Sequence, residues 1–498
     1  MTDNKIAVLT SMGGGGAQMP MGSIMTYQAR RDPSAPAVTI GGRTTTRGEL
    51  EAGANRRARA LQALGVEQDQ FVTIALPNSL EFYETALAVW KLGAVPNHVS
   101  SRLPAAELDG IIDIVRPAVV VGVEPERARG YQSRPVGWTP DPLLSADPLP
   151  DAVARHWKAS TSGGSTGRPK VIVDNHPSTW SPTSPMTGQV LDDTALNPGP
   201  LYHNAPFSIS LVTILTGGHV VDMGKFDALE ALRLIEKHRI GYAYMVPTMM
   251  HRIWRLPPEQ RNAFDLSSLR TLVHMAAPCP PWLKEAWIDW LGPEVIWESY
   301  GGTENIGSTV IKGTEWLTHR GSVGRATRGE LLILGPDRQP LPAGEIGEVC
   351  FRRAADAPKP YHYLGVESSE DTVETIGDLG WVDDEGYLYL ADRRTDLIIS
   401  GGANIYAAEV EAAIDSHPDV LSSIVIGLPD DDLGKRVHAI VQCIPGDAAA
   451  GEGELREHLA GRLARYKLPR SFEFVQEALR DDAGKARRSA LAAERSDG

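Results

Sequence analysis

The stretch from Ser160 to Lys170, STSGGSTGRPK, combines glycines, short hydroxyl side chains and a terminal lysine. Glycines let backbone N–H groups approach a ligand closely, and the hydroxyls and the lysine add donors and a positive charge. Phosphate oxygens are the natural partners of such a set of donors. The pattern therefore predicts a phosphate-binding loop, made of Ser162, Gly163, Gly164, Ser165, Thr166, Gly167 and Lys170.

The spacing within this loop excludes two common phosphate motifs and leaves two alternatives open. In a Walker A loop the lysine directly follows the last glycine, whereas Arg168 and Pro169 intervene here. The glycines also do not fit the G-x-G-x-x-G fingerprint of dinucleotide-binding folds. Residues 163–167 do fit the G-x-S-x-G elbow of serine hydrolases, although no HGGG-type segment precedes them. A serine hydrolase and an empty Gly/Ser linker are therefore the alternatives.

A second motif, Y-G-G-T-E at residues 300–304, follows the apolar strand predicted at 295–297. In open α/β sheets, ligands bind beyond the carboxyl ends of the strands, which is where this turn belongs. Tyr300 offers a flat face to a base, Thr303 a hydroxyl to an anionic group, and Glu304 a hard oxygen ligand to Mg²⁺. The turn 276–278 follows the neighbouring strand, and its small side chains leave room for a planar ring.

Three further polar residues lie later in the chain. Asp378, in G-D-L-G-W, is a suitable acceptor for a ribose diol, and Arg393 can pair with phosphate or ribose oxygens. Lys485 follows Gly484 on a predicted exposed turn. Each of these residues, taken alone, is equally typical of a solvated surface.

Length and charge narrow the class of protein. The chain has 498 residues, 42% hydrophobic and 22% charged, with a formal net charge of −14. Such a charge disfavours non-specific binding to nucleic acids or anionic membranes, so an anionic ligand needs a local positive site. No apolar stretch approaches 18 residues, and the three separated cysteines indicate neither disulfides nor a zinc site. We expect a cytoplasmic protein.

Strand and helix patterns alternate over most of the chain, which predicts an α/β fold with doubly wound sheets. Short segments separated by Gly and Pro predict a smaller, mostly antiparallel β unit at about 320–394. A compact α+β domain is expected after it. The predicted boundaries are therefore 1–394 for a large N-terminal domain and 395–498 for a small C-terminal domain.

The order of these motifs resembles that of the acyl-adenylate-forming enzymes. The series consists of the Gly/Ser/Thr loop ending in lysine, YGGTE, GDLGW, DRRTDLIISGGANIYAAEVE and a late Gly-Lys. The resemblance covers residues from about 25 to about 495. LPNSLEFYETALAVWKLGAVPNHVS and PLYHN look like the acyl-CoA synthetase branch, and SGGSTGRPK is similar to the loop of bile-acid-type CoA ligases.

The resemblance implies an AMP-forming acid–CoA ligase that uses ATP, Mg²⁺ and CoA. Catalytic roles are implied for Lys485, Thr303, Glu304 and Lys170, with Glu304 also holding the metal. Beside the phosphate loop, the implied contacts with nucleotide and CoA are Ala276, Ala277, Pro278, Glu298, Ser299, Tyr300, Gly301, Asp378, Arg393, Gly401 and Gly402. In such enzymes the C-terminal domain rotates about a hinge, here Thr395.

The sequence carries the least information about the acid pocket. The residues expected to line it are His203, Asn204, Phe207, His274, Met275 and Gly302. Small residues in the two nearby turns favour a bulky polycyclic or terpenoid acid, with medium-chain and aryl acids as the alternatives. Alternatives are a stand-alone enzyme that loads a carrier-protein thiol, and a nucleotide-binding protein without turnover. A homodimer is also compatible with the sequence.

Overall fold

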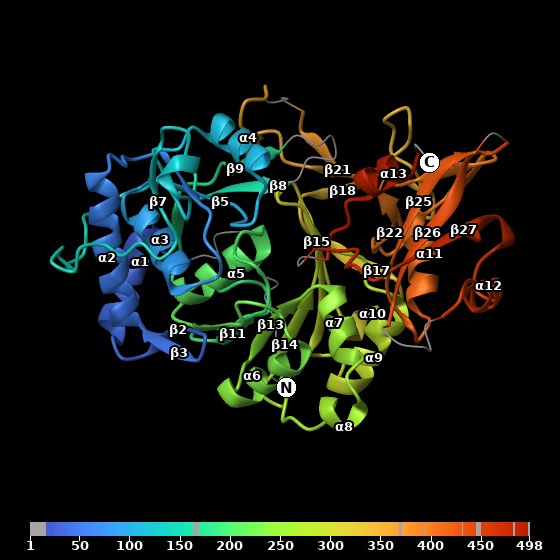
Figure 1. The fold of residues 1–498 in the computed structure, drawn as a ribbon, viewed down its shortest axis with the longest axis horizontal. Coiled ribbons are helices and arrows are strands. Elements are labelled where there is room, and N and C mark those ends of the chain that lie inside the picture. Colours follow the sequence, from blue (N-terminus) through green and yellow to red (C-terminus); the bar gives the residue numbers. More distant parts are fainter. Residues whose placement is uncertain are drawn as a thin grey trace.

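A computed structural model describes residues 16–162, 169–367, 371–393, 395–430, 432–444, 450–481 and 484–496. Two large sheets and a third, C-terminal sheet organise the chain (Figure 1). Among the described residues, no helix has the length and apolar character needed to cross a bilayer. We call residues 16–393 the N-terminal part and residues 395–496 the C-terminal unit.

The first sheet has seven strands, with a parallel centre and antiparallel pairs at one end. Its order is β20 (Tyr361–Tyr363), β9 (Lys170–Asp174), β8 (Ala159–Ser162), β5 (Val95–His98), β4 (Phe71–Ile74), β6 (Val119–Val121) and β7 (Gln132–Arg134). The helices between these strands are α2 (Arg47–Ala63), α3 (Leu80–Lys91) and α4 (Ala105–Val115). Capping fixes where two of them begin: Thr46 and Glu49 form a capping box on α2, and the Ser79 hydroxyl accepts the Phe82 N–H on α3.

The second sheet has thirteen strands. Its mainly parallel half contains β15 (Ile296–Gly301), β14 (Thr271–His274), β13 (Tyr242–Met245), β11 (Thr194–Asn197), β12 (His219–Asp222), β2 (Pro36–Ile40) and β3 (Arg43–Thr46). Helices flanking this half are α1 (Met21–Arg31), α5 (Asn204–Leu215), α6 (Ala228–His238), α7 (Pro247–Trp254) and α9 (Pro281–Leu291). The predicted alternation of strand and helix is confirmed here.

The antiparallel strands continue this same sheet. They are β16 (Ser308–Lys312), β17 (Ser322–Arg328), β22 (Leu388–Arg393), β21 (Val373–Val382), β19 (Gly347–Arg352) and β18 (Glu330–Leu334). The expected β unit at 320–394 is therefore antiparallel as predicted, but it is joined through β16 to β15 by hydrogen bonds. The change from parallel to antiparallel pairing occurs directly at the Y-G-G-T-E turn.

The C-terminal unit builds its own α+β layer. It contains the hairpin β23 (Ile398–Ser400) and β24 (Ala403–Ile405), the sheet β25 (Val420–Asp430), β26 (Gly434–Cys443) and β27 (Ser471–Val475), and the helices α11 (Ala407–Asp415), α12 (Glu452–Ala460) and α13 (Arg488–Ser496). A cluster of buried apolar residues within this segment, including Val410, Val425 and Val441, gives it a separate core. The predicted boundary at 394/395 remains a prediction.

Candidate active site

The carboxyl ends of the parallel strands in both sheets meet at the turn before α5. His98, the last residue of β5, donates from Nδ1 to the Tyr202 carbonyl oxygen at 2.8 Å. Its Nε2 lies 3.1 Å from the Ser160 hydroxyl of β8. Burial lowers the pKa of His98 to about 3, so the ring is neutral and Nε2 accepts from the hydroxyl. The two sheets are thus tied together where ligands of such folds bind.

Tyr300, Asp378 and Arg393 form one hydrogen-bonded group at this edge. The Tyr300 hydroxyl donates to Asp378 Oδ2 at 2.7 Å, and Arg393 Nε lies 3.3 Å from Oδ1 of the same carboxylate. Asp378 and Arg393 are paired in register on β21 and β22. Burial raises the pKa of Asp378, while Arg393 and Tyr300 oppose this shift. Residues nearly eighty positions apart therefore converge as the motif order predicts.

Glu304 and Lys170 are connected through Tyr363 of β20. The Tyr363 hydroxyl donates to Glu304 Oε1 at 2.9 Å, and Lys170 Nζ lies 5.2 Å from the centre of the Tyr363 ring. The end of the glycine-rich loop and the Y-G-G-T-E turn therefore face each other. The predicted phosphate contacts Gly163, Gly164, Ser165, Thr166 and Gly167, and the Ser162 side chain, lie outside the described residues.

Lys485 of the C-terminal unit approaches the same group. Its side chain is exposed, yet enough protein surrounds its ammonium that desolvation lowers the pKa of Lys485. The charge of Arg393 lowers this pKa further, and Asp481 and Glu304 oppose the shift. The turn is seated on α7: a Cβ added at Gly484 lies 3.3 Å from the Thr248 hydroxyl.

The remaining residues of the two strand-end turns present small or polar groups. Ala276 is exposed in the left-handed region (φ 71°), and Ala277 and Met275 are half-buried. The hydroxyl of Thr303 has no protein partner among the described residues and is not enclosed. A Cβ added at Gly302 lies 2.9 Å from Glu304 Oε2 and from Ile376 Cγ2, so glycine is required there for close packing. Pro278 and Gly301 are exposed, and Ser299 is half-buried.

Glu298 and His274 differ from the expectation that they face the nucleotide and the acid. Lys284 of α9, itself fully buried, donates to Glu298 Oε2 at 2.6 Å. His274 is fully buried beside this ion pair, with Nε2 3.8 Å from the same oxygen. Burial lowers the pKa of His274 to about 4. Glu298 is thus held by Lys284, and both ring nitrogens of the buried His274 lack a hydrogen bond among the described residues, so neither side chain lines an open surface.

Of the residues predicted to line the acid pocket, some are also buried, whereas others keep accessible surface. Phe207 is fully buried and stacks on His98 with ring centroids 4.2 Å apart, so it supports the site from inside. His203 and Asn204 are half-buried at the start of α5, and the Tyr202 and His203 rings lie 4.3 Å apart. The Asn204 amide oxygen accepts a hydrogen bond from the buried amine of Lys158. Of this predicted set, His203, Asn204, Met275 and Gly302 keep accessible surface.

The predicted CoA turn lies within the C-terminal unit. Gly401 and Gly402 both have positive φ (56° and 80°) and join β23 to β24, a conformation that favours glycine. The Gly401 N–H donates to the Leu433 carbonyl at 2.9 Å. Thr395, the predicted hinge, donates through its hydroxyl to Asp396 Oδ1 at 3.1 Å. Their roles in CoA binding and rotation stay predictions.

Sequence reasoning missed Tyr363, Lys158 and Arg255. Tyr363 belongs to a short strand whose alternation, Y-H-Y, was too brief to indicate function. Lys158 is a single charged residue before the short polar strand β8, and Arg255 follows an ordinary amphipathic helix. Their roles depend on partners distant in the chain, which no local pattern reveals.

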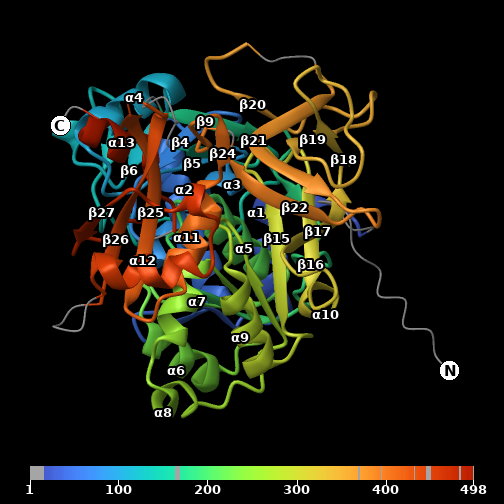
Figure 2. The same cartoon turned by 90° about the vertical axis from the view of Figure 1, so that its right-hand side faces the viewer.

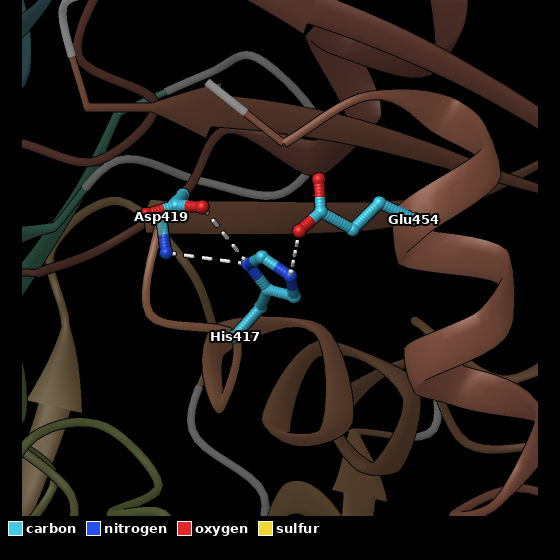
Figure 3. A group of neighbouring side chains, drawn as sticks. All are labelled: His417, Asp419 and Glu454. Atoms are coloured by element: carbon cyan, nitrogen blue, oxygen red, sulfur yellow. Dashed lines mark hydrogen bonds and ion pairs between the residues drawn. The ribbon is translucent and has the colours of Figure 1, made fainter. Parts of the chain in front are cut away.

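One other group offers potential metal ligands. His417, Asp419 and Glu454 of the C-terminal unit bring one ligand atom each within 4.8 Å of one another (Figure 3). However, His417 Nδ1 accepts the Asp419 backbone N–H at 3.2 Å, which leaves the proton on Nε2, facing Glu454 Oε1 at 3.7 Å. Both ring nitrogens thus face protein groups, the second beyond hydrogen-bond distance, and we assign no metal to these described residues.

Comparison with known proteins agrees with this geometry. The family model described as AMP-binding enzyme matches residues 25–358, and that of the AMP-binding enzyme C-terminal domain matches residues 409–485. Feruloyl-CoA synthase of Amycolatopsis sp. is 34% identical, over 93% of this chain and 97% of its own length. The long-chain-fatty-acid–CoA ligase FadD13 of Mycobacterium tuberculosis is 31% identical, over 90% and 92%. A fatty acid–[acyl-carrier-protein] ligase, ScoC of Streptomyces coeruleorubidus, is 30% identical, over 94% of both chains.

Among solved structures, the chain is similar to o-succinylbenzoate CoA synthetase (MenE) from Bacillus subtilis in two states. The complex with the acyl-adenylate intermediate has a TM-score of 0.79 at 25% identity, covering 95% of this chain and 98% of that one. The complex with ATP and magnesium ion has a TM-score of 0.78 at 25% identity, covering 95% and 100%.

Proposed function

The chain belongs to the AMP-binding enzyme family, and from this premise we propose that it is an ATP-dependent, AMP-forming acid–CoA ligase. The observation that carries the proposal is the convergence of Tyr300, Asp378, Glu304 and Lys485 at one sheet edge. These side chains come from three distant segments, and each suits a different part of an acyl-adenylate.

In the first step, a carboxylate oxygen of the acid attacks the α-phosphorus of ATP and the bond to pyrophosphate breaks. The transfer depends on positioning and on stabilisation of charge, without a protein nucleophile. Asp378 accepts from the ribose hydroxyls, and Tyr300 and the turn 276–278 flank the base. Lys485 stabilises the negative charge that develops between the carboxylate and the α-phosphate. In the second step the CoA thiol attacks the acyl carbon and AMP leaves.

Glu304 fits the role of a Mg²⁺ ligand. Tyr363 takes one of its carboxylate oxygens, while Oε2 has no hydrogen bond among the described residues. Mg²⁺ commonly takes only one or two protein carboxylates and completes its shell with water and phosphate oxygens. The bound ion would neutralise charge on the triphosphate.

We propose CoA as the acceptor in preference to a carrier protein. Two of the relatives named above are CoA-dependent by name, and MenE is also a CoA synthetase. Because ScoC is named a carrier-protein ligase, free CoA and a holo-carrier protein must be compared directly as acceptors. A homodimer stays a prediction, to be checked by light scattering.

We propose a ring-bearing acid, polycyclic or terpenoid, as the substrate class. The accessible residues at the site include the small Ala277, together with Asn204 and Met275. An aryl acid is the nearest competing class, since feruloyl-CoA synthase is a relative.

A pyrophosphate-release assay over a panel of carboxylic acids tests the proposal. We expect release that requires acid, ATP and Mg²⁺ together, with AMP as the nucleotide product. ATP binding without turnover of any acid would indicate a silent nucleotide-binding protein. Labelling of Ser165 by a fluorophosphonate would instead favour the serine hydrolase.

A further inference from the structure

Lys158 is a buried lysine whose amine bonds only to neutral oxygens. Its residue is 3% exposed and stands directly before β8. Nζ donates to the amide oxygen of Asn204 and to the Ser208 hydroxyl, the latter at 3.1 Å. No carboxylate of the described residues lies within 4 Å of this amine. Burying an ammonium without an ionic partner is costly, so stability alone does not account for it.

The surroundings are mixed for a cation. The amine lies 4.3 Å from the centre of the Trp157 ring, a cation–π contact that favours it, within an aromatic cluster that also contains Phe207. The amine also lies at the start of α5, the end of a helix that repels cations. Desolvation lowers the pKa of Lys158 to about 8, partly opposed by the charge of Asp174, so the amine is still mostly protonated at neutral pH. In the absence of an ionic partner, the contact of this amine that reaches the site is the one to Asn204.

The amine fixes which way the Asn204 amide points. An ammonium has only donors, so the atom that it contacts must be the amide oxygen, Oδ1. The Ser208 hydroxyl donates to the same oxygen at 3.4 Å. Both N–H bonds of Nδ2 must then point elsewhere, in one fixed orientation.

That amide nitrogen is accessible and has no protein acceptor. Among the described residues nothing accepts from Asn204 Nδ2, and the nitrogen is not enclosed. Its neighbours Tyr202, His203 and Ala205 are likewise half-buried. The start of α5 thus presents an oriented donor, polarised by a cation behind it, at the edge where the acid is proposed to bind.

We propose that Asn204 donates a hydrogen bond to an oxygen on the acyl portion of the substrate, and that Lys158 is the positioning residue behind it. The substrate class is thereby a ring-bearing acid that carries a keto, hydroxyl or second carboxyl group remote from the reacting carboxylate. This inference rests on the proposed function. A hydrocarbon acid would leave the donor unsatisfied, and sites built for a hydrogen bond discriminate strongly against such analogues.

The experiment compares matched acids on one enzyme. Decalin- and cyclohexanecarboxylic acids are each assayed unsubstituted and with a remote keto, hydroxyl or carboxyl group. In the wild type, kcat/KM is expected to be about 10–100 times higher for an oxygenated acid than for its parent, as expected when a polar site rejects an unpaired analogue. The three substituents distinguish a neutral acceptor from a carboxylate.

Variants of Asn204 and Lys158 test whether these residues cause the difference in kcat/KM between oxygenated and parent acids. Asn204→Ala and Lys158→Met should both bring the ratio close to one, with the KM for ATP unchanged. Lys158→Gln keeps a neutral donor to Oδ1 and should restore part of the ratio. Lys91→Met is the matched control: it removes another buried lysine, paired with Glu51 at 2.8 Å, and should lower stability without changing the ratio.

Failure of this inference and of the proposed function give different results. No pyrophosphate release with any acid contradicts the proposed function. Turnover with a wild-type ratio near one, or with a ratio that Asn204→Ala leaves unchanged, overturns this inference and leaves the ligase assignment intact. If Lys158→Met does not fold, Lys158→Gln and Asn204→Ala still decide, because the ratio is measured within one protein sample.

Discussion

The two parts of the molecule hold their catalytic groups in different ways. In the N-terminal part, Tyr300 and Asp378 are fixed by mutual hydrogen bonds, and Glu304 is fixed by Tyr363. In the C-terminal unit, the Lys485 ammonium is exposed and has no hydrogen bond or ion pair among the described residues. The first part is therefore preorganised for the nucleotide, while the second supplies a charge whose position depends on how the unit is seated.

One arginine makes several of the contacts that seat the C-terminal unit. Arg255, at the end of α7, donates to the carbonyl oxygens of His417, Pro418 and Val420, just after α11. Its Nε donates to His251 Nε2 at 2.9 Å. Figure 2, viewed from the C-terminal side, shows α11 above α7. Substitutions of Asp378, Lys485 and Arg255 should therefore have three distinguishable effects.

Loss of the Lys485 charge should have the largest effect on activity. In Lys485→Ala, acyl-adenylate formation is expected to fall by about 10²–10³, because a preorganised charge stabiliser typically contributes that much. Thioester formation from a synthetic acyl-adenylate should be unchanged. Pyrophosphate release and thioester assays measure the two steps separately. Lys237→Ala, on exposed α6, is the control, and equal losses in both steps would argue against the assigned role.

Loss of the fixed carboxylate should act on ATP binding. Asp378→Asn keeps the shape but removes the charge, and hydrogen bonds to charged groups contribute about 1.5–3 kcal/mol. The KM for ATP is therefore expected to rise about 10–100-fold, with little change in the KM for the acid. The exposed Asp384→Asn, on the same β hairpin, should leave both constants as they are. A rise confined to the acid would contradict the ribose assignment.

Loss of the seating contact should have a smaller effect. Arg255→Ala removes the bonds to three carbonyls, so the C-terminal unit should spend less time with Lys485 at the site. We expect adenylation to slow about tenfold, equivalent to about 1.4 kcal/mol, while the second step is unaffected. The exposed Arg252→Ala is the control on the same helix. Unchanged adenylation would show that other contacts seat the unit.

Acidification should change the folding stability of the two parts in opposite directions, and the effect should be modest. Burial lowers the pKa of His219, His251 and His274 to about 4, so the unfolded chain binds more protons below pH 6.5. The N-terminal part then loses about 1.4 kcal/mol per histidine for each pH unit between 6.5 and 4. Burial raises the pKa of Asp415 to about 7, so its protonation favours the folded C-terminal unit as pH falls.

Hydrogen exchange measured by peptide at pH 7 and pH 5, corrected for intrinsic rates, checks this difference. Strands β11–β14 should lose more protection at pH 5 than β25 and β26. Equal losses in both sheets would contradict the assignment of opposite pH responses.

The sequence predicted the strands, helices and motif order well because these depend on local periodicity and capping. It did not predict that Glu298 pairs with Lys284, since that contact requires α9 to pack beneath β15. The orientation of the Asn204 amide could not be predicted from the sequence either, because Lys158 lies 46 positions away. The continuity of the thirteen-stranded sheet depends on pairing between β15 and β16, for which the chain carries no local signal.

The most direct measurement follows a labelled oxygen atom from the carboxylate of the acid into the products. When an acid labelled with ¹⁸O in its carboxylate reacts with ATP and CoA, attack on the α-phosphorus leaves one labelled oxygen in AMP and one in the acyl-CoA. The account predicts AMP heavier by one ¹⁸O atom in mass spectra. Unlabelled AMP, or ADP with the label in inorganic phosphate, would contradict it.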